Sequence, residues 1–316
     1  MSTLGTTDPH VLASRETHRR ARRGENRPRA GHLWVYAVLM LGSLAFLTPF
    51  YFVLNGSLKT DEAVQKGDFV TPVAKPQYHN YRDALVRLGL KTKADLPQNF
   101  TARAVPTFPA LSNTVVITVL TIAGQILSCS LVGFGFARFK FRGRGILFIL
   151  MISTMMLPAQ VTMIPLFVLF TKLNLIDTFW PLVLPAFFAS PFFVFMFRQF
   201  FSQIPEELIE AARMDGAGNW RVYWQFMLPL SGPVIAIVAI YTFLGAWNDF
   251  LGPLIYLNSP GNRTLALALN SFKGQYGTTD AHMLMAASVV CMVPCVLLFF
   301  AAQKYFVESV AGSSIK

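Results

Sequence analysis

Two stretches of at least 25 residues in the middle of this chain contain no charged residue, a length that can cross a lipid bilayer. They are residues 111–137 and 146–170. About 20 consecutive apolar residues suffice for a helix to span the hydrocarbon core. Every backbone polar group must be paired inside the chain in that medium, so such stretches fold as helices. This constraint predicts an all-α membrane protein.

Four further stretches are apolar enough to be membrane spans: residues 33–54, 179–197, 230–257 and 283–302. Composition supports this interpretation, because 53% of the residues are hydrophobic and only 14% are charged, whereas soluble domains carry about 25% charged residues. We therefore expect a polytopic protein with six transmembrane helices. Cys129, Cys291 and Cys295 all fall inside these spans, which favours small buried hydrophobic groups over a disulfide or a metal site.

The basic residues identify the side on which each loop lies. Arginines crowd residues 1–32, and a second basic group fills 138–144, two crossings later. Basic residues beside membrane spans mark the cytoplasmic side. This pattern predicts that both termini lie in the cytoplasm. It also explains the net charge of +11, so the positive charge does not indicate a nucleic-acid-binding protein. We expect residues 1–32 to form a disordered basic tail, residues 33–316 to form the membrane domain, and residues 55–110 to be extracytoplasmic.

A polar cassette, PEELIEAARMDG at 205–216, interrupts this apolar sequence. Pro205 suits the first position of a helix, and Glu206 and Glu207 favour its positive end. Gly216 is expected in the left-handed region after the helix. An apolar face is predicted from four residues: Leu208, Ala211, Ala212 and Met214.

A second short helix should follow the glycine turn, with Asn219 as its cap and Trp220 as its first residue. Residues 201–227 would then form a pair of short helices at the cytoplasmic surface. On physical grounds alone, an ordinary amphipathic interfacial loop explains this pattern equally well.

The cassette resembles a family motif. Glu210-Ala211-Ala212, Gly216 and Leu228-Pro229 are similar to the "EAA…G…LP" motif of ABC-importer permeases. Further stretches, among them AWNDFLGPLIYL at 246–257 and QKYFVESVAG at 303–312, resemble the second permease subunit of carbohydrate importers of the maltose type. The resemblance covers roughly residues 33–316. The external segment 55–110 is longer than in that family.

The resemblance implies a permease that forms half of a carbohydrate pathway and is coupled to cytoplasmic ATPases through an EAA coupling-helix loop. The coupling residues it implies are Leu208, Glu210, Ala211, Ala212, Asp215, Gly216, Leu228 and Pro229. The implied partners are a homologous permease, two ATPase subunits and an extracytoplasmic solute-binding protein, in a prokaryotic plasma (inner) membrane.

No GxxxxGK[ST] phosphate-binding motif occurs in the sequence, so we expect ATP and Mg to be bound by the partner ATPases. No catalytic or metal-ligating constellation is evident either. The chain is therefore expected not to be an enzyme and to bind no cofactor itself.

Polar residues within the spans are candidates for the substrate pathway: Asn113, Gln160, Trp247, Asn248 and Asp249. An ionisable group inside a span is a functional candidate because its burial is costly. Two alternatives stay open: Asp249 could cap or brace a neighbouring segment, and the amides could join helices to one another.

The external segment 258–282 opens on a turn sequence, and the family places a contact loop here. Candidate contacts for the binding protein are Ser259, Pro260, Gly261 and Asn262.

Two other functions compete. The first is an importer of the same family for a solute other than a sugar. The second is a stand-alone secondary transporter, which should carry inverted repeats and intramembrane charges for ion coupling. Neither feature is evident in the sequence.

Overall fold

The computed structural model describes residues 33–89, 109–272 and 280–313. All regular structure in these ranges is helical. The chain divides into two compact units, residues 1–52 and 53–316. The predicted tail at 1–32 lies outside the described residues.

Helix α2 (Leu33–Ser57) corresponds to the first predicted span. Two hydroxyl groups inside it donate to backbone carbonyls one turn earlier, Ser43 to Leu39 at 2.8 Å and Thr48 to Leu44 at 2.9 Å. These hydroxyl groups are therefore satisfied inside the helix, as a hydrocarbon environment requires.

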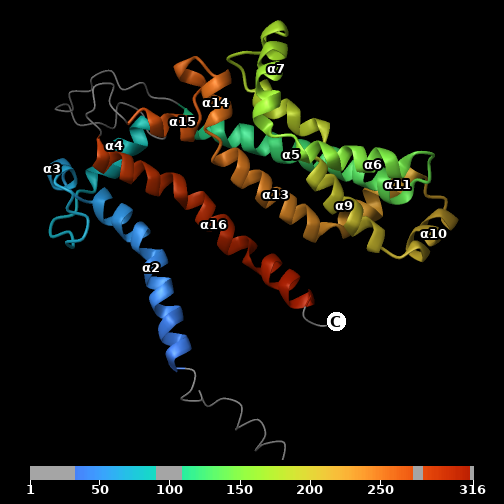
Figure 1. Ribbon diagram of the computed structural model, residues 1–316, viewed down its shortest axis with the longest axis horizontal. Helices are drawn as coiled ribbons and strands as arrows, with labels where there is room; N and C mark the ends of the chain where they lie inside the picture. Colours follow the sequence, from blue (N-terminus) through green and yellow to red (C-terminus); the bar gives the residue numbers. More distant parts are fainter. Residues whose placement is uncertain (1–32, 90–108, 273–279, 314–316) are drawn as a thin grey trace, which may run out of the picture. The chain divides into compact units, whose positions relative to one another are not determined.

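Helix α5 (Ala110–Arg138) is the centre of the larger unit and packs against α9 (Pro191–Gln203) and α13 (Gly232–Trp247) (Figure 1). Glycine permits the close approach to α9. A Cβ at Gly133 would lie 2.7 Å from the Cβ of Phe197, closer than real carbon contacts. Phe134, Phe197 and Phe201 are buried and belong to the same apolar core. Dispersion contacts and the burial of apolar surface stabilise this core.

Four segments among the described residues are long and apolar enough to cross a membrane: Trp34–Ser57, Ala110–Arg138, Trp180–Gln203 and Ala281–Gln303. The third begins with α8 (Trp180–Val183) and the 3₁₀ turn η4 (Leu184–Phe188) and continues into α9. The fourth is the first part of α16 (Ala281–Ser313).

The span predicted at 146–170 is not one straight helix. The segment consists of α6 (Arg144–Ser153), the 3₁₀ turn η3 (Thr154–Met156) and α7 (Ala159–Lys172), and its two arms meet at 96°. The break lies at Leu157, whose ψ of 121° is extended. The following Pro158 disfavours a helical conformation of the residue before it, so the helix stops there.

The bounds of the span predicted at 230–257 were wrong. Helix α13 ends at Trp247, and a separate α14 (Leu251–Tyr256) follows a break at 248–250. Before α13, the segment Asn219–Leu230 is bent by 75° from it. That segment contains α11 (Asn219–Val222), a π-helical turn η5 (Tyr223–Met227) and α12 (Leu228–Leu230). Six spans result only if each bent pair crosses once, so the number stays a prediction.

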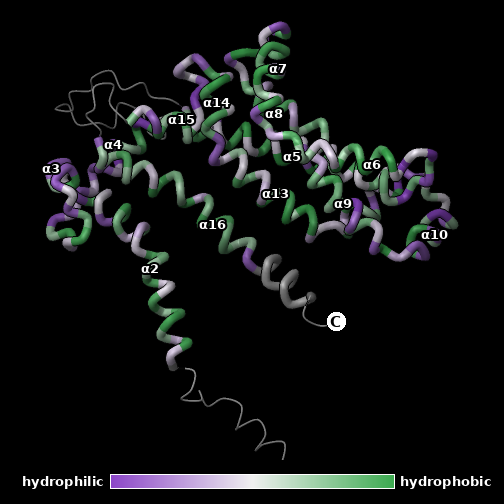
Figure 2. The backbone as a smooth tube through the Cα atoms, in the orientation of Figure 1, coloured by the Kyte–Doolittle hydropathy of each residue, from purple (hydrophilic) through white to green (hydrophobic). Residues whose placement is uncertain are grey.

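Hydrophilic residues gather around α3 (Asp61–Gln65) and around α10 (Glu206–Met214), and also at the outer ends of α7 and α14 (Figure 2). Both α3 and the next helix, α4 (His79–Arg87), pack against α16. Arg87 pairs with Asp280 there at 2.8 Å. Helices α3 and α4 lie in the described part of the predicted extracytoplasmic segment; residues 90–108 are not described.

The external segment after α14 is partly helical. Ser259 precedes a 3₁₀ turn, η6 (Pro260–Asn262), as the turn sequence predicts. Helix α15 (Leu265–Asn270) follows, and residues 273–279 lie outside the described residues.

Candidate functional site

The polar cassette folds as two short helices joined by a glycine turn, as the sequence predicts. Gly216 has a φ of 81°, the left-handed conformation that favours glycine. Helix α10 ends just before it, and α11 begins just after it. Pro205 occupies the cap position and Glu206 is the first helical residue, one position later than predicted.

One face of α10 is buried within the chain, and the other is exposed. Ile209 and Ala212 are buried and join the apolar core that contains Phe201. Leu208 is 43% exposed and Met214 is 88% exposed, so these two residues of the predicted apolar face lie at the surface, whereas Ala212 is turned into the chain. The spacing of Ile209 and Ala212, three positions apart, is the helical signal that the sequence interpretation missed.

The prediction that Asn219 caps the second helix was wrong. Gly218 is at the cap position, and Asn219 is the first residue of α11. The Asn219 side chain instead accepts a hydrogen bond from Arg213 Nη2 at 3.2 Å. This bond joins α10 to α11 across the glycine turn.

A half-buried arginine fixes the position at which the cassette begins. Arg138, the last residue of α5, donates through Nη2 to the carbonyl oxygens of Phe201 and Ile204, each at 2.6 Å. These carbonyls belong to the end of α9, where no intrahelical donor remains. Sequence reasoning counted Arg138 only as part of a basic loop.

The cassette therefore has one anchored face and one exposed face. The exposed group contains Leu208, Glu210, Ala211, Met214 and Asp215. Of the other predicted coupling residues, Ala212 is buried, Leu228 is partly buried against the core, and Pro229 is exposed in α12. An exposed Met and Leu flanked by carboxylates form an apolar contact surface with a negative rim.

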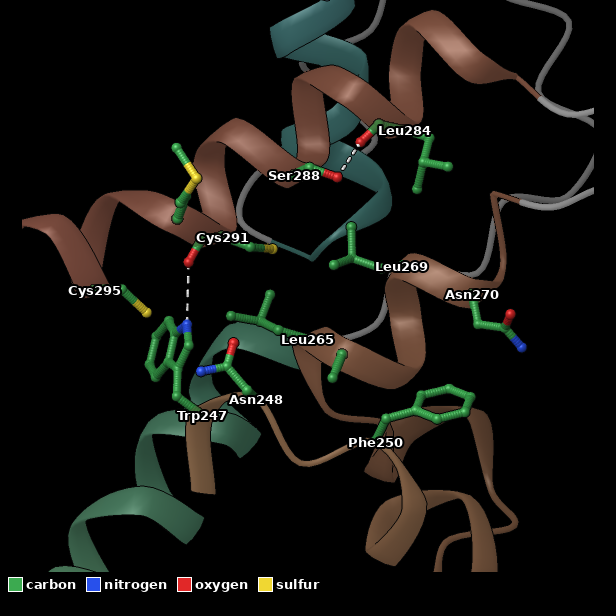
Figure 3. A pocket seen from close by; sticks show the side chains of 12 residues that line it. Trp247, Asn248, Phe250, Leu265, Leu269, Asn270, Leu284, Ser288, Cys291 and Cys295 are labelled. Carbon is green, nitrogen blue, oxygen red and sulfur yellow. Dashed lines mark hydrogen bonds between the residues drawn. The ribbon is translucent and has the colours of Figure 1, made fainter. Parts of the chain in front are cut away.

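The adjacent residues Trp247, Asn248 and Asp249 lie on two different cavities. Trp247 and Asn248 line a pocket of about 500 Å³ with residues of α15 and α16 (Figure 3). Trp247 Nε1 donates there to the carbonyl of Cys291 at 3.1 Å.

Asp249 lines a separate cavity of about 310 Å³ together with residues of α5 and α13. Its Oδ1 accepts a hydrogen bond from the Gly252 amide at 3.1 Å. The side chain thus caps the start of α14, the bracing role considered above, while it also faces the cavity.

The two remaining pathway candidates lie elsewhere. Asn113 is buried, and its Nδ2 donates to the carbonyls of Gly261 at 2.8 Å and Arg263 at 3.0 Å. Its amide therefore joins α5 to the external segment. Gln160 is exposed in the first turn of α7 and lines neither cavity.

Sequence reasoning missed an aspartate that organises the external turn. Asp177 accepts hydrogen bonds from the amides of Asn258 and Ser259 at 2.9 and 2.8 Å, and from the Ser259 hydroxyl. These hydrogen bonds lower the pKa of Asp177 to about 2, with the Ser259 hydroxyl as the largest cause. The side chains of Ser259 and Asn262 are engaged by Asp177, whereas Pro260 and Gly261 are exposed.

Comparison with known proteins gives consistent results. Residues 130–312 match the family described as "Binding-protein-dependent transport system inner membrane component". The chain is 33% identical over 284 residues to the arabinooligosaccharides transport system permease protein AraQ of Bacillus subtilis (strain 168), covering 88% of this chain and 93% of that protein. It is 31% identical over 290 residues to the sn-glycerol-3-phosphate transport system permease protein UgpE of Yersinia pestis bv. Antiqua (strain Antiqua), covering 92% and 99%.

Among solved structures, the fold is similar to a chain of a bacterial ABC transporter involved in the import of the acidic polysaccharide alginate. The TM-score is 0.72 at 22% identity, and the alignment covers 89% of this chain and 99% of that one. This likeness concerns the fold.

Proposed function

Because the chain belongs to the family of binding-protein-dependent transport system inner membrane components, we propose that it is a permease subunit of an ATP-driven carbohydrate importer. It forms half of the translocation pathway and responds to ATP hydrolysis through α10. The chain is a transport protein and not an enzyme. ATP and Mg are bound by partner ATPase subunits.

The exposed face of α10 is the observation that carries this proposal. Met214 is 88% exposed on a helix whose opposite face is held by buried Ile209 and Ala212. A partner that covers Leu208 and Met214 gains hydrophobic contact, and Glu210 offers a charge to a basic residue. Arg138 ties α5 to the end of α9, directly before α10, and Asn219 ties α10 to α11. A force applied to α10 therefore reaches the membrane helices.

The names of the relatives support carbohydrate as the substrate class. They include permeases for arabinooligosaccharides and a probable permease for starch degradation products. The glycerol-phosphate permease keeps an importer of another solute as the alternative.

The complete transporter contains this chain, a homologous permease, two ATPase subunits and an extracytoplasmic solute-binding protein. In a prokaryotic plasma membrane, both termini and the loop 201–227 face the cytoplasm, and residues 55–110 face outward. The external turn contacts the binding protein mainly through Pro260 and Gly261, since the side chains of Ser259 and Asn262 are engaged by Asp177.

Replacement of Met214 tests the role of α10. Met214→Asp would place an unpaired charge in the contact, at a cost of about 2–5 kcal/mol if the residue is buried by a partner. We expect the ATPase subunits to be lost when the tagged permease complex is purified. Met214→Leu keeps the apolar contact and serves as the matched control.

Both variants should reach the membrane at wild-type levels, since the Met214 side chain is exposed in this chain. Full recovery of the ATPase with Met214→Asp would show that α10 is an ordinary surface helix.

A further inference from the structure

Three buried hydroxyl groups without hydrogen-bond partners surround the cavity that Asp249 lines. They belong to Thr121, Thr242 and Thr264. Thr242 is 7% exposed and Thr264 is 3% exposed. Most buried polar groups in proteins are paired, and an unpaired one costs about 1–3 kcal/mol. Three such groups at one cavity indicate a place for a polar occupant.

Four parts of the chain supply the cavity wall. Helix α5 provides Thr121 and Gln125, α13 provides Tyr241 and Thr242, Asp249 lies at the break after α13, and Thr264 precedes α15. The Cys129 thiol donates to Gln125 Oε1 at 3.1 Å, which leaves the amide Nε2 as a donor toward the cavity. Donors, acceptors and an aromatic ring thus converge on a space of about 310 Å³, which falls at the small end of ligand pockets.

The larger pocket beside Trp247 differs in how many of its hydrogen-bond donors are available to a ligand. The donors of three side chains that line it are already used within the chain: Trp247 donates to Cys291, Asn248 to Leu244, and Ser288 to Leu284, at 3.1, 2.9 and 2.7 Å. Figure 3 draws the first and the last of these bonds. A polar ligand there would gain less from these groups. The unpaired hydroxyl groups therefore favour the smaller cavity, although it is not the largest.

We propose that the cavity lined by Thr121, Thr242, Thr264 and Asp249 is a subsite for one ring of an uncharged carbohydrate on its way through the permease. This inference rests on the proposed function and narrows its substrate class. A sugar hydroxyl can donate and accept at once, so it can pair with a threonine hydroxyl and with the second oxygen of Asp249. The Tyr241 ring offers an apolar face beside these polar groups, as ligand pockets commonly do.

The charge of the wall selects against anionic substrates. Among the described residues that line the cavity there is no lysine or arginine, and Asp249 takes part in none of the ion pairs found in the described part of the chain. A phosphate or carboxylate would place a second acceptor group of like charge beside Asp249, which is costly in a low-dielectric site. The cavity therefore fits arabinose- or glucose-type rings and not sugar acids or sugar phosphates.

Protection of an introduced cysteine from labelling by the substrate tests whether the sugar occupies this cavity. The complete transporter carrying Thr242→Cys is treated with a small hydrophilic thiol reagent, with ATP and binding protein present, and labelling is measured for each cysteine by mass spectrometry. Maltotriose or arabinotriose, whichever the wild type imports, should slow labelling at position 242 at least about threefold. The native Cys291 and Cys295, which line the other pocket, are internal controls and should be unaffected.

Replacing the polar side chains of the cavity wall tests whether their hydrogen bonds to the sugar support transport. Thr242→Val replaces one hydroxyl by a methyl group of similar shape, and we expect the maximal uptake rate to fall about tenfold. ATP hydrolysis stimulated by the loaded binding protein should persist, so that sugar imported per ATP falls. Asp249→Asn should act in the same direction, and Ser288→Ala, in the other pocket, is the matched control.

The outcomes separate the two proposals. If wild-type transporter imports no carbohydrate with ATP, the proposed function fails. If it does, but labelling at 242 is unprotected and Thr242→Val imports normally, the cavity holds only water and the subsite is refuted. Slower labelling of Cys291 in place of position 242 would also refute it, because the sugar would then occupy the larger pocket.

Discussion

At the scale of single residues, Asp177 shows how much structure one side chain can organise. Its φ of 63° is left-handed, a conformation that aspartate tolerates better than most residues. Six hydrogen bonds join it to residues 256–262, including one from its own amide to the carbonyl of Tyr256 at 2.8 Å. A rigid turn loses less conformational entropy when a partner binds it.

The lowered pKa of Asp177 predicts how this turn responds to pH. The carboxylate form is stabilised, so its contribution is complete above the ordinary pKa of 3.8 and is lost as pH falls through about 2. Hydrogen exchange of the Asn258 and Ser259 amides should therefore show constant protection between about pH 5 and 8. Asp177→Ala should remove that protection at every pH. Equal protection in wild type and Asp177→Ala would mean that the backbone alone holds the turn.

Asp249 and its neighbours show a limit of sequence reasoning at the same scale. The stretch from Trp247 to Asp249 was interpreted as one group, but the helix ends at Trp247 and the next residues leave its axis. Trp247 and Asp249 then face different cavities. The unpaired threonines could not be recognised from the sequence, because whether a hydroxyl finds a partner depends on helices far apart along the chain.

At the scale of elements, proline and apolar length explain most of what was predictable. The uncharged stretch at 111–137 is a helix as expected, because nothing inside it interrupts the pattern. Pro158 ends a helix, yet Pro165 lies inside α7 without ending it. Composition cannot distinguish these two prolines, since the difference lies in whether the residue before each one remains helical.

Arg138 acts between elements, and its replacement should separate assembly from coupling. Arg138→Gln removes the guanidinium that pairs with the carbonyls of Phe201 and Ile204. We expect the ATPase still to bind, because the exposed face of α10 is unchanged, while stimulation of hydrolysis by loaded binding protein falls at least about fivefold. The reason is that the end of α9, which leads into α10, is then less firmly tied to α5, so that α10 transmits less force.

Arg144→Gln is the matched control for that experiment. Arg144 is a nearby basic residue whose guanidinium makes a longer hydrogen bond, 3.3 Å to the carbonyl of Phe139. Arg138→Lys keeps the positive charge but lacks the planar guanidinium group with its paired N–H donors. We expect it to retain part of the stimulation of ATP hydrolysis. If Arg138→Gln and Arg144→Gln behave alike, Arg138 has no role in coupling.

At the scale of the whole molecule, apolar length, basic clusters and the cassette predicted the all-α membrane fold and the family, and both are confirmed. The size of the bends, 96° and 75°, could not be predicted. Hydropathy measures how much apolar sequence is present, whereas the direction of each helix depends on packing against others. The side on which each loop lies stays a prediction.

The central claim is that ATP hydrolysed by partner subunits drives carbohydrate through this chain. The most direct measurement is uptake of maltotriose or arabinotriose into proteoliposomes that contain the complete transporter, with binding protein outside and ATP inside. The account predicts uptake that requires both ATP and binding protein and that is lost with Met214→Asp. Uptake by this polypeptide alone, driven by an ion gradient without ATP, would contradict it.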